Sequence, residues 1–137
     1  GRTYRYITEK PLYPFGYGLS YTTFNYSDVK LLPGDGKGTY TRVAVTVTNT
    51  GKCEGEEVVQ LYVRDEVASI TRPIKELKGF EKIKLSPGES KMVTFDVKDE
   101  QLGFYNNQMK FIVEKGDFTL MVGGNSRDLQ EIKYILN

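Results

Sequence analysis

Hydrophobic and polar residues alternate with a period of two along most of the chain. In residues 41–49, Val43, Val45 and Val47 fall on one face of an extended segment, whereas Thr46 and Thr48 fall on the other. Alternation of β-branched residues in this way predicts a half-buried β-strand. The same pattern predicts about seven strands, at residues 23–32, 41–49, 56–64, 77–85, 91–97, 117–122 and 130–136.

Segments with turn-forming residues separate these predicted strands. Examples are residues 33–36 (PGDG), 86–88 (SPG) and 123–125 (GGN). Proline presets one backbone angle and glycine tolerates positive φ, so each segment predicts a turn. Short strands with a turn at each end predict an all-β fold, an antiparallel β-sandwich. Only residues 99–102 show a pattern that favours a short helical turn.

The N-terminal 22 residues depart from this pattern, since they lack alternation and contain two prolines and two glycines within residues 11–22. We therefore divide the chain into an aromatic arm or linker, residues 1–22, and a sandwich domain, residues 23–137. The arm and the start of the first predicted strand hold eight of the seventeen aromatic residues, namely Tyr4, Tyr6, Tyr13, Phe15, Tyr17, Tyr21, Phe24 and Tyr26.

Composition excludes several classes of site. The chain has no histidine and a single cysteine, which excludes Ser-His and Cys-His nucleophilic sites, imidazole zinc sites and an intrachain disulfide. The segment Gly16-x-Gly18 has no predicted strand before it and no predicted helix after it, so it is not a dinucleotide fingerprint. We expect no metal and no cofactor.

Charge and hydropathy give little support to nucleic acid or membrane partners. The 19 basic residues nearly balance the 18 acidic ones, so composition imposes no basic face. No run approaches the roughly 18 consecutive apolar residues of a membrane span. No charged-then-apolar leader opens the sequence, so we expect no signal peptide within it.

Acidic side chains cluster twice, at Glu54, Glu56 and Glu57 around the start of one predicted strand, and at Asp96, Asp99 and Glu100 around the end of another. A glycosidase needs two carboxyl groups at a defined separation in a cleft, and clustering in sequence does not supply a cleft. We interpret both clusters as a solvated rim that discourages strand edges from pairing with other chains.

The aromatic arm has three interpretations. Its tyrosines could stack on sugar rings, or they could stack on single-stranded nucleic acid with Arg2, Arg5 and Lys10 near phosphates. Three cations are few for nucleic acid. The arm could instead be structural, since each Tyr or Phe buries a large area and a buried Tyr hydroxyl needs only one partner. The structural interpretation is favoured, with packing either on the arm's own sandwich or on another domain.

In addition to its composition, the chain contains a series of sequence motifs along its length. They are GRTYRY at 1–6, PLYPFGYGLSYT at 11–22, GEEVVQLYVRD at 55–65, RPIKELKGF at 72–80, LSPGES at 85–90, EKGDF at 114–118 and VGGNS at 122–126.

These motifs together resemble the C-terminal domain of family 3 glycoside hydrolases, the β-glucosidases and β-xylosidases, and the segment that leads into it. The resemblance implies an immunoglobulin-like, fibronectin type III-like sandwich. It also implies a parent enzyme whose catalytic Asp lies on an upstream barrel domain, with the acid/base on that barrel or on the following α/β domain. No position of this chain matches a catalytic residue, so no catalytic residue is assigned. A periplasmic or extracellular location is implied.

The resemblance favours an accessory domain that braces the catalytic domains of the same parent chain. The arm residues Tyr4, Tyr6, Tyr13, Phe15, Tyr17 and Tyr21 are the expected interdomain contacts. A carbohydrate-binding module is the alternative, and it would need a flat row of exposed aromatics, for which Tyr40, Tyr62 and Tyr105 are the candidates outside the arm. A free-standing interaction domain is a further alternative.

Overall fold

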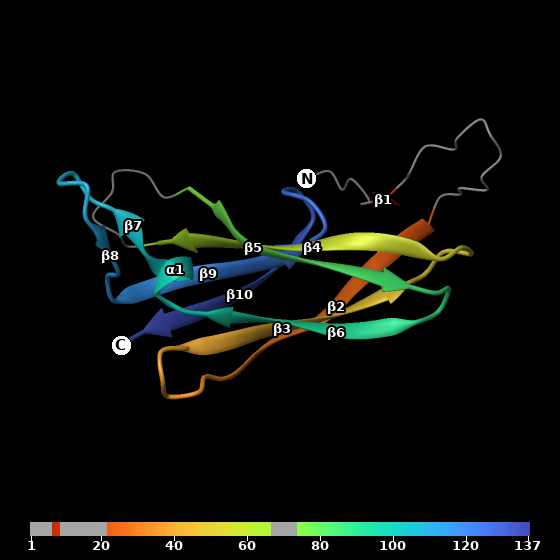
Figure 1. Cartoon of the computed structure of the whole chain (residues 1–137), viewed down its shortest axis with the longest axis horizontal. Helices are drawn as coiled ribbons and strands as arrows, with labels where there is room; N and C mark the ends of the chain where they lie inside the picture. The colour runs from red at the N-terminus through yellow and green to blue at the C-terminus, as the bar shows by residue number, and fades with distance from the viewer. Residues whose placement is uncertain (1–6, 9–21, 67–73) are drawn as a thin grey trace.

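Two four-stranded antiparallel sheets lie face to face as a β-sandwich in the computed structural model, which describes residues 7–8, 22–66 and 74–137 (Figure 1). In spatial order, one sheet contains β1 (Ile7–Thr8), β2 (Thr22–Pro33), β3 (Thr41–Asn49) and β6 (Ser90–Val97). The other contains β10 (Leu129–Leu136), β9 (Gly116–Gly123), β4 (Gly55–Asp65) and β5 (Glu76–Leu85).

This architecture confirms the predicted all-β, immunoglobulin-like sandwich. All seven predicted strands form, with ends within one residue of those predicted. The predicted helical turn is α1 (Asp99–Leu102). Three strands of two residues each were not predicted: β1, and the pair β7 (Phe104–Tyr105) and β8 (Phe111–Ile112), which form a small separate sheet. Two residues are too few to show an alternation.

The core lies between the two sheets and consists of the residues that alternation places on the inner faces. Val43, Val45 and Val47 of β3 are fully buried, as are Phe118 and Leu120 of β9. Strand β9 is buried on both of its faces, because Thr119 and Met121 are 1% exposed as well. Its backbone pairs with β10 on one side and with β4 on the other.

Strand β2 changes its inward face at a β-bulge. Its pairing with β3 is regular up to Ser27 and resumes at Lys30, and Asp28 between them has a φ of 58°. A bulge inserts an extra residue and shifts which side chains point inward. Phe24 and Tyr26 therefore contact the core before the bulge, and Val29 and Leu31 contact it afterwards.

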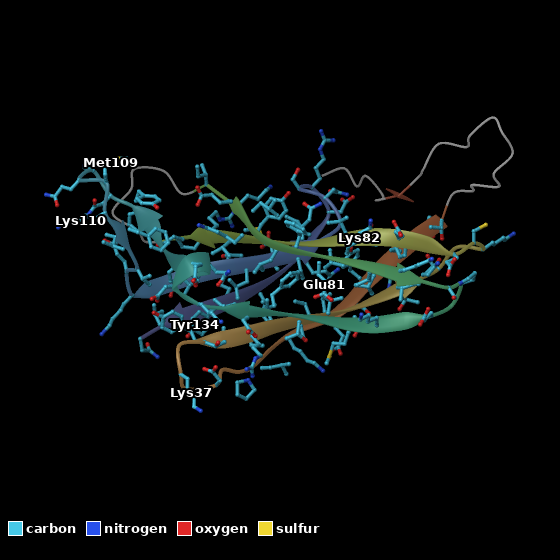
Figure 2. All side chains as sticks on the ribbon, in the orientation of Figure 1. Lys37, Glu81, Lys82, Met109, Lys110 and Tyr134 are labelled. Carbon is cyan, nitrogen blue, oxygen red and sulfur yellow. The ribbon has the colours of Figure 1, made fainter. Side chains whose placement is uncertain are left out.

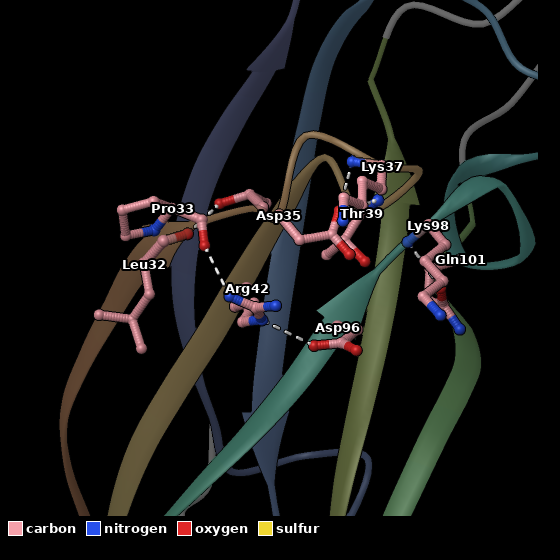
Figure 3. Close-up of polar contacts among 10 residues, drawn as sticks. Leu32, Pro33, Asp35, Lys37, Thr39, Arg42, Asp96, Lys98 and Gln101 are labelled. Atoms are coloured by element: carbon pink, nitrogen blue, oxygen red, sulfur yellow. Dashed lines mark hydrogen bonds and ion pairs between the residues drawn. The ribbon is translucent and has the colours of Figure 1, made fainter.

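The β2–β3 loop is held by side chains at its base (Figure 3). Asp35 Oδ1 accepts hydrogen bonds from the backbone amides of Lys37 at 2.6 Å and Thr39 at 3.1 Å, and these bonds lower the pKa of that carboxyl. Arg42 donates to the Pro33 carbonyl and to Asp96 Oδ1, both at 3.0 Å. These contacts join the ends of β2, β3 and β6.

A buried asparagine ties the start of β2 to the opposite sheet. Asn49 is fully buried, and its Nδ2 donates to the carbonyls of Cys53 and Leu85, each at 2.9 Å. Its Oδ1 accepts from Thr22 Oγ1 at 2.7 Å and from the Gly51 amide at 2.9 Å. The side-chain amide of Asn49 thus uses both of its N–H donors and its acceptor oxygen. It joins the start of β2, the turn after β3 and the end of β5.

The close approach of Thr22 to the β3–β4 turn requires glycine at two positions. A Cβ at Gly51 would lie 2.4 Å from Thr22 Oγ1 and 2.9 Å from Thr22 Cα. A Cβ at Gly55 would lie 2.4 Å from Thr22 Cγ2. Any larger residue would push the first residue of β2 away from Asn49, so Gly51 and Gly55 set where the arm joins the sandwich.

The substitution Asn49→Ala should destabilise the domain strongly. It leaves the buried Leu85 carbonyl and Gly51 amide without their side-chain partner, at an expected cost of about 3 kcal/mol in the free energy of unfolding measured by urea denaturation. The adjacent Thr48→Ala is the control, because Thr48 Oγ1 shares only an exposed hydrogen bond with Ser90. We expect it to cost about 0.5 kcal/mol. Equal losses in both variants would contradict the role of Asn49.

Acid should weaken the contact that closes β4 onto β9. Glu66 Oε2 accepts from Thr119 Oγ1 at 2.6 Å and from Arg64 Nε at 2.8 Å, and these two bonds lower the pKa of Glu66 below its ordinary value of 4.5. A carboxyl whose pKa is lowered by folding stabilises the protein above the unfolded pKa, and that contribution disappears as pH falls through the folded pKa.

The difference in free energy of unfolding between the native chain and Glu66→Gln should therefore be largest near about pH 6 and shrink towards about pH 3. A difference that stays constant over this range would show that the ionised carboxylate contributes nothing specific.

Candidate functional site

The six expected interdomain contacts, Tyr4, Tyr6, Tyr13, Phe15, Tyr17 and Tyr21, lie outside the described residues. The structure does describe where the arm joins the sandwich. Within the arm, Ile7 and Thr8 of β1 pair with Thr23 and Thr22 of β2, and Thr22 is buried. The arm is thus connected to the sandwich by the β1–β2 backbone pairing and by the hydrogen bond between Thr22 and the buried Asn49.

The interpretation of the first acidic cluster as a solvated rim is wrong for Glu57, which is only 2% exposed. Alternation in β4 places Glu57 on the same face as Val59, Leu61 and Val63, which is the inner face. Glu57 Oε2 accepts a 2.6 Å hydrogen bond from Tyr26 Oη on the facing sheet. A buried carboxyl needs such a donor, and this one links the two sheets across the core.

The remaining acidic side chains of both clusters are exposed, as a solvated rim requires. Glu54 and Glu56 face lysines of the neighbouring strand, with 3.9 Å between Glu54 and Lys84 and 3.3 Å between Glu56 and Lys82. Exposed pairs of this kind contribute little to stability. Asp96 pairs with Arg42, as described above, and Asp99 accepts a hydrogen bond from Tyr40 Oη.

A groove of about 530 Å³ lies at the end of the sandwich that carries α1 and the β7–β8 hairpin. Its walls come from β4, β5, α1 and the hairpin. Its apolar lining includes the buried Val63 and Leu102 and the exposed Ile74, Tyr105 and Phe111. The polar lining residues are Asp65, Glu76, Lys78 and Gln101.

The aromatic wall of the groove depends on a close contact at Gly103. A Cβ at Gly103 would lie 2.4 Å from Cε2 and Cζ of Phe111, so the Phe111 ring packs directly on this glycine. The Phe111 and Tyr105 rings meet edge to face, with centroids 5.2 Å apart and an interplanar angle of 62°. The hairpin therefore presents two aromatic rings in a fixed arrangement. Figure 2 shows the exposed Met109 and Lys110 at its outer end.

The remaining lining of the groove comes from α1 and from β5, which has a bulge at Lys78. The Lys98 amide donates to Gln101 Oε1 at 2.7 Å, which caps the helical turn (Figure 3). The register between β4 and β5 shifts between Leu61 and Tyr62, which leaves Lys78 without a partner residue in the ladder. Lys78 Nζ lies 3.4 Å from both the Gly103 carbonyl oxygen and Glu76 Oε1.

Tyr40 supports the same helical turn from the other sheet. Its hydroxyl donates to Asp99 Oδ1, the first residue of α1, and this hydrogen bond raises the pKa of Tyr40 above its ordinary value of 10.0. Because Tyr40 directly precedes β3, the bond joins α1 to the start of that strand. Sequence reasoning missed the groove, because its residues come from segments that are far apart in the chain.

The three tyrosines considered for a sugar-binding row do not share one face. Tyr40 directly precedes β3 of one sheet, Tyr62 lies in β4 of the other, and Tyr105 lies in β7 of the small separate sheet. Tyr62 Oη donates to Gln60 Oε1 within its own strand. Of the three, only Tyr105 lines the groove.

The described part of the chain holds no group of three or more His, Cys, Asp or Glu side chains placed to bind a metal ion. Among the same residues, the structure has no helix of sufficient length and hydrophobicity to cross a membrane.

Comparisons with known proteins identify a domain family and, among the similar proteins, several β-glucosidases. Residues 57–126 match the fibronectin type III-like domain. The chain is 52% identical over 135 residues to a periplasmic β-glucosidase of Salmonella typhimurium, covering 94% of this chain but 17% of that protein. It is 49% identical over 131 residues to thermostable β-glucosidase B of Acetivibrio thermocellus, covering 92% of this chain and again 17% of the relative. The chain thus spans about a sixth of the length of these relatives.

A solved β-glucosidase structure from Erythrobacter marinus shows the same fold. It superposes on 99% of this chain with a TM-score of 0.77 and 44% sequence identity, and the match covers 18% of that structure. A β-glucosidase from Listeria innocua solved with glucose superposes on 92% of this chain with a TM-score of 0.73 and 41% identity.

The substitution Tyr26→Phe should weaken the contact between the two sheets. It removes the hydroxyl that donates to the buried Glu57 carboxyl, at an expected cost of about 2 kcal/mol in the free energy of unfolding measured by urea denaturation. Tyr62→Phe is the matched control, because its hydroxyl donates to the neutral side chain of Gln60. We expect the control to cost about 0.5 kcal/mol. The inter-sheet role of Tyr26 is refuted if both variants lose the same amount.

Proposed function

The chain belongs to the fibronectin type III-like domain family, and from this premise we propose that it is a non-catalytic accessory domain of a β-glycosidase. The parent enzyme would hydrolyse terminal β-D-glucosides or β-D-xylosides with retention of configuration. The single observation that carries the proposal is coverage: the relatives match nearly the whole chain, whereas the chain matches only a small share of each relative.

The environments of Glu54, Glu56 and Glu57 support a non-catalytic role for these three carboxyl groups. Retaining glycosidases place two carboxyl groups about 5–5.5 Å apart on either side of the scissile bond. Glu57 is buried between the sheets against Tyr26, and Glu54 and Glu56 face lysines on the surface. None of these three is placed to protonate or attack a glycosidic bond in a cleft.

The bracing role is assigned to the arm, residues 1–22, with residues 23–137 as the domain that it attaches. Burying a Tyr or Phe side chain against a neighbouring domain contributes roughly 1.5–3 kcal/mol. Several such contacts would hold two domains in one orientation, whereas small polar interdomain interfaces allow relative movement. The buried Thr22 and Asn49 give the arm a rigid point of attachment.

The partners of the domain are then the catalytic domains of its own parent chain. The location is periplasmic or extracellular, an inference supported by the similarity to the periplasmic β-glucosidase of Salmonella typhimurium.

Removing arm aromatics should uncouple this domain from its parent. In the full-length protein that carries this chain, the triple variant Tyr13→Ala, Phe15→Ala and Tyr17→Ala should split one calorimetric unfolding transition into two or lower it by about 5 °C or more. In the 137-residue chain alone, the same changes should shift Tm by less than about 2 °C, because the proposed contacts are with other domains of the parent protein.

The control is Met92→Ala, which removes an apolar side chain exposed on the outer face of β6. It should leave the unfolding of the full-length protein unchanged. An equally large loss of Tm in the 137-residue chain would show that the arm packs on its own sandwich and would contradict the bracing role.

A further inference from the structure

We propose that the groove between β5, α1 and the β7–β8 hairpin binds a pyranose unit of a β-linked oligosaccharide. The inference rests on the proposed function for its biological sense, since an accessory domain of a β-glycosidase would meet such chains. The site itself is argued from its volume, its two rings and its charged wall. With about 530 Å³, the groove falls within the range of roughly 300–1,000 Å³ that is usual for small-molecule sites.

The aromatic wall suits the apolar face of a sugar. Tyr105 is 66% exposed and Phe111 is 42% exposed, so both rings are available to solvent or ligand. The edge-to-face contact between them and the packing of Phe111 on Gly103 fix their orientations. Rings that are already ordered lose little conformational entropy when a ligand stacks on them, and the C–H groups of a pyranose pack well on such a surface.

A charged pair beside the rings suits the hydroxyl edge of the same sugar, because Lys78 Nζ reaches the carbonyl of Gly103, the residue on which Phe111 packs. Lys78 Nζ and Glu76 Oε1 are 3.4 Å apart, which places a donor beside an acceptor. The ammonium has three N–H donors and the carboxylate about four acceptor sites, so this pair has capacity beyond its mutual contact. Adjacent hydroxyl groups, each both donor and acceptor, can bind Lys78 and Glu76 together. Gln101 is a further polar residue of the lining.

This combination of aromatic rings and a charged pair favours a sugar over a protein segment. An apolar side chain from another domain would fit the rings, but it would remove water from Lys78 and Glu76 without replacing the hydrogen bonds, which is costly. Sugar hydroxyls replace those hydrogen bonds. A sugar therefore satisfies both the aromatic and the charged lining of the groove.

The groove is also remote from the attachment of the arm. In Figure 1 the hairpin lies at one end of the sandwich and the start of β2, where the arm joins, lies at the other. The domain can therefore be held to its parent at one end and bind a sugar chain at the other. A pyranose bound there would keep a polysaccharide close to the enzyme.

The test is an NMR titration of the ¹⁵N-labelled 137-residue chain with cellotetraose and, separately, with xylotetraose. We expect saturable shifts at the amides of Gln101, Gly103, Tyr105 and Phe111 with at least one of the two sugars. Tyr105→Ala should weaken binding about tenfold, because the stacking surface is lost. Tyr105→Phe should restore affinity to within about threefold, because the ring remains.

Phe80→Ala is the matched control, since Phe80 is an exposed aromatic that does not line the groove. It should leave affinity unchanged. Gly103→Ala is a second variant that displaces the Phe111 ring without removing an aromatic, and it should also weaken binding.

Three results would overturn the proposal: no saturable shift with either sugar up to about 20 mM, equal losses of affinity for Tyr105→Ala and Phe80→Ala, or shifts confined to amides outside the groove. A fourth is that Tyr105→Ala lowers Tm of the full-length protein as much as the arm variant does while no sugar binds, which would identify the groove as an interdomain contact. The bracing role stands or falls on the arm variants alone, so the two failures are distinguishable.

Discussion

The buried side chain of Asn49 is the constraint on which the arrangement of this domain depends. It joins the first residue of β2, the turn after β3 and the end of β5, so it connects both sheets at one corner. A side-chain amide can do this because it has two donors and an acceptor with two lone pairs. Gly51 and Gly55 allow Thr22 to approach closely enough to take part. These contacts fix the position of Thr22, and with it the point at which the arm meets the sandwich and β2 begins.

The two ends of the sandwich differ in chemistry because different structural elements form them. At the Asn49 end, buried polar groups hydrogen-bond to one another beside the first residue of β2. At the opposite end, α1 and the β7–β8 hairpin leave a groove whose rings and charged groups remain accessible. Between these ends, Tyr26 and Glu57 add a polar link across an otherwise apolar core. The two proposals thus place attachment to a larger enzyme at one end of the sandwich and ligand binding at the other.

The sequence predicted the fold well, because alternation of inward and outward residues is a local property that seven strands display. It did not predict three other features: the burial of Glu57, the bulge in β2 and the groove. Glu57 has the same parity as Val59 and Leu61, and this parity would have identified it as buried had strand position been weighed above the preference of carboxylates for water. The bulge at Asp28 appears in sequence only as a change of parity between Tyr26 and Val29. The groove brings together Ile74, Gly103 and Phe111, which no local pattern connects.

The central claim is that this chain is a non-catalytic domain of a retaining β-glycosidase. The most direct measurement compares the 137-residue chain with the full-length protein that carries it, using p-nitrophenyl β-D-glucoside and β-D-xyloside as substrates and NMR to follow the anomeric configuration of the released sugar. The account predicts that the full-length protein hydrolyses at least one substrate with retention, while the chain alone gives no rate above the uncatalysed reaction. Turnover by the chain alone, or a full-length protein that hydrolyses neither glycoside, would contradict it.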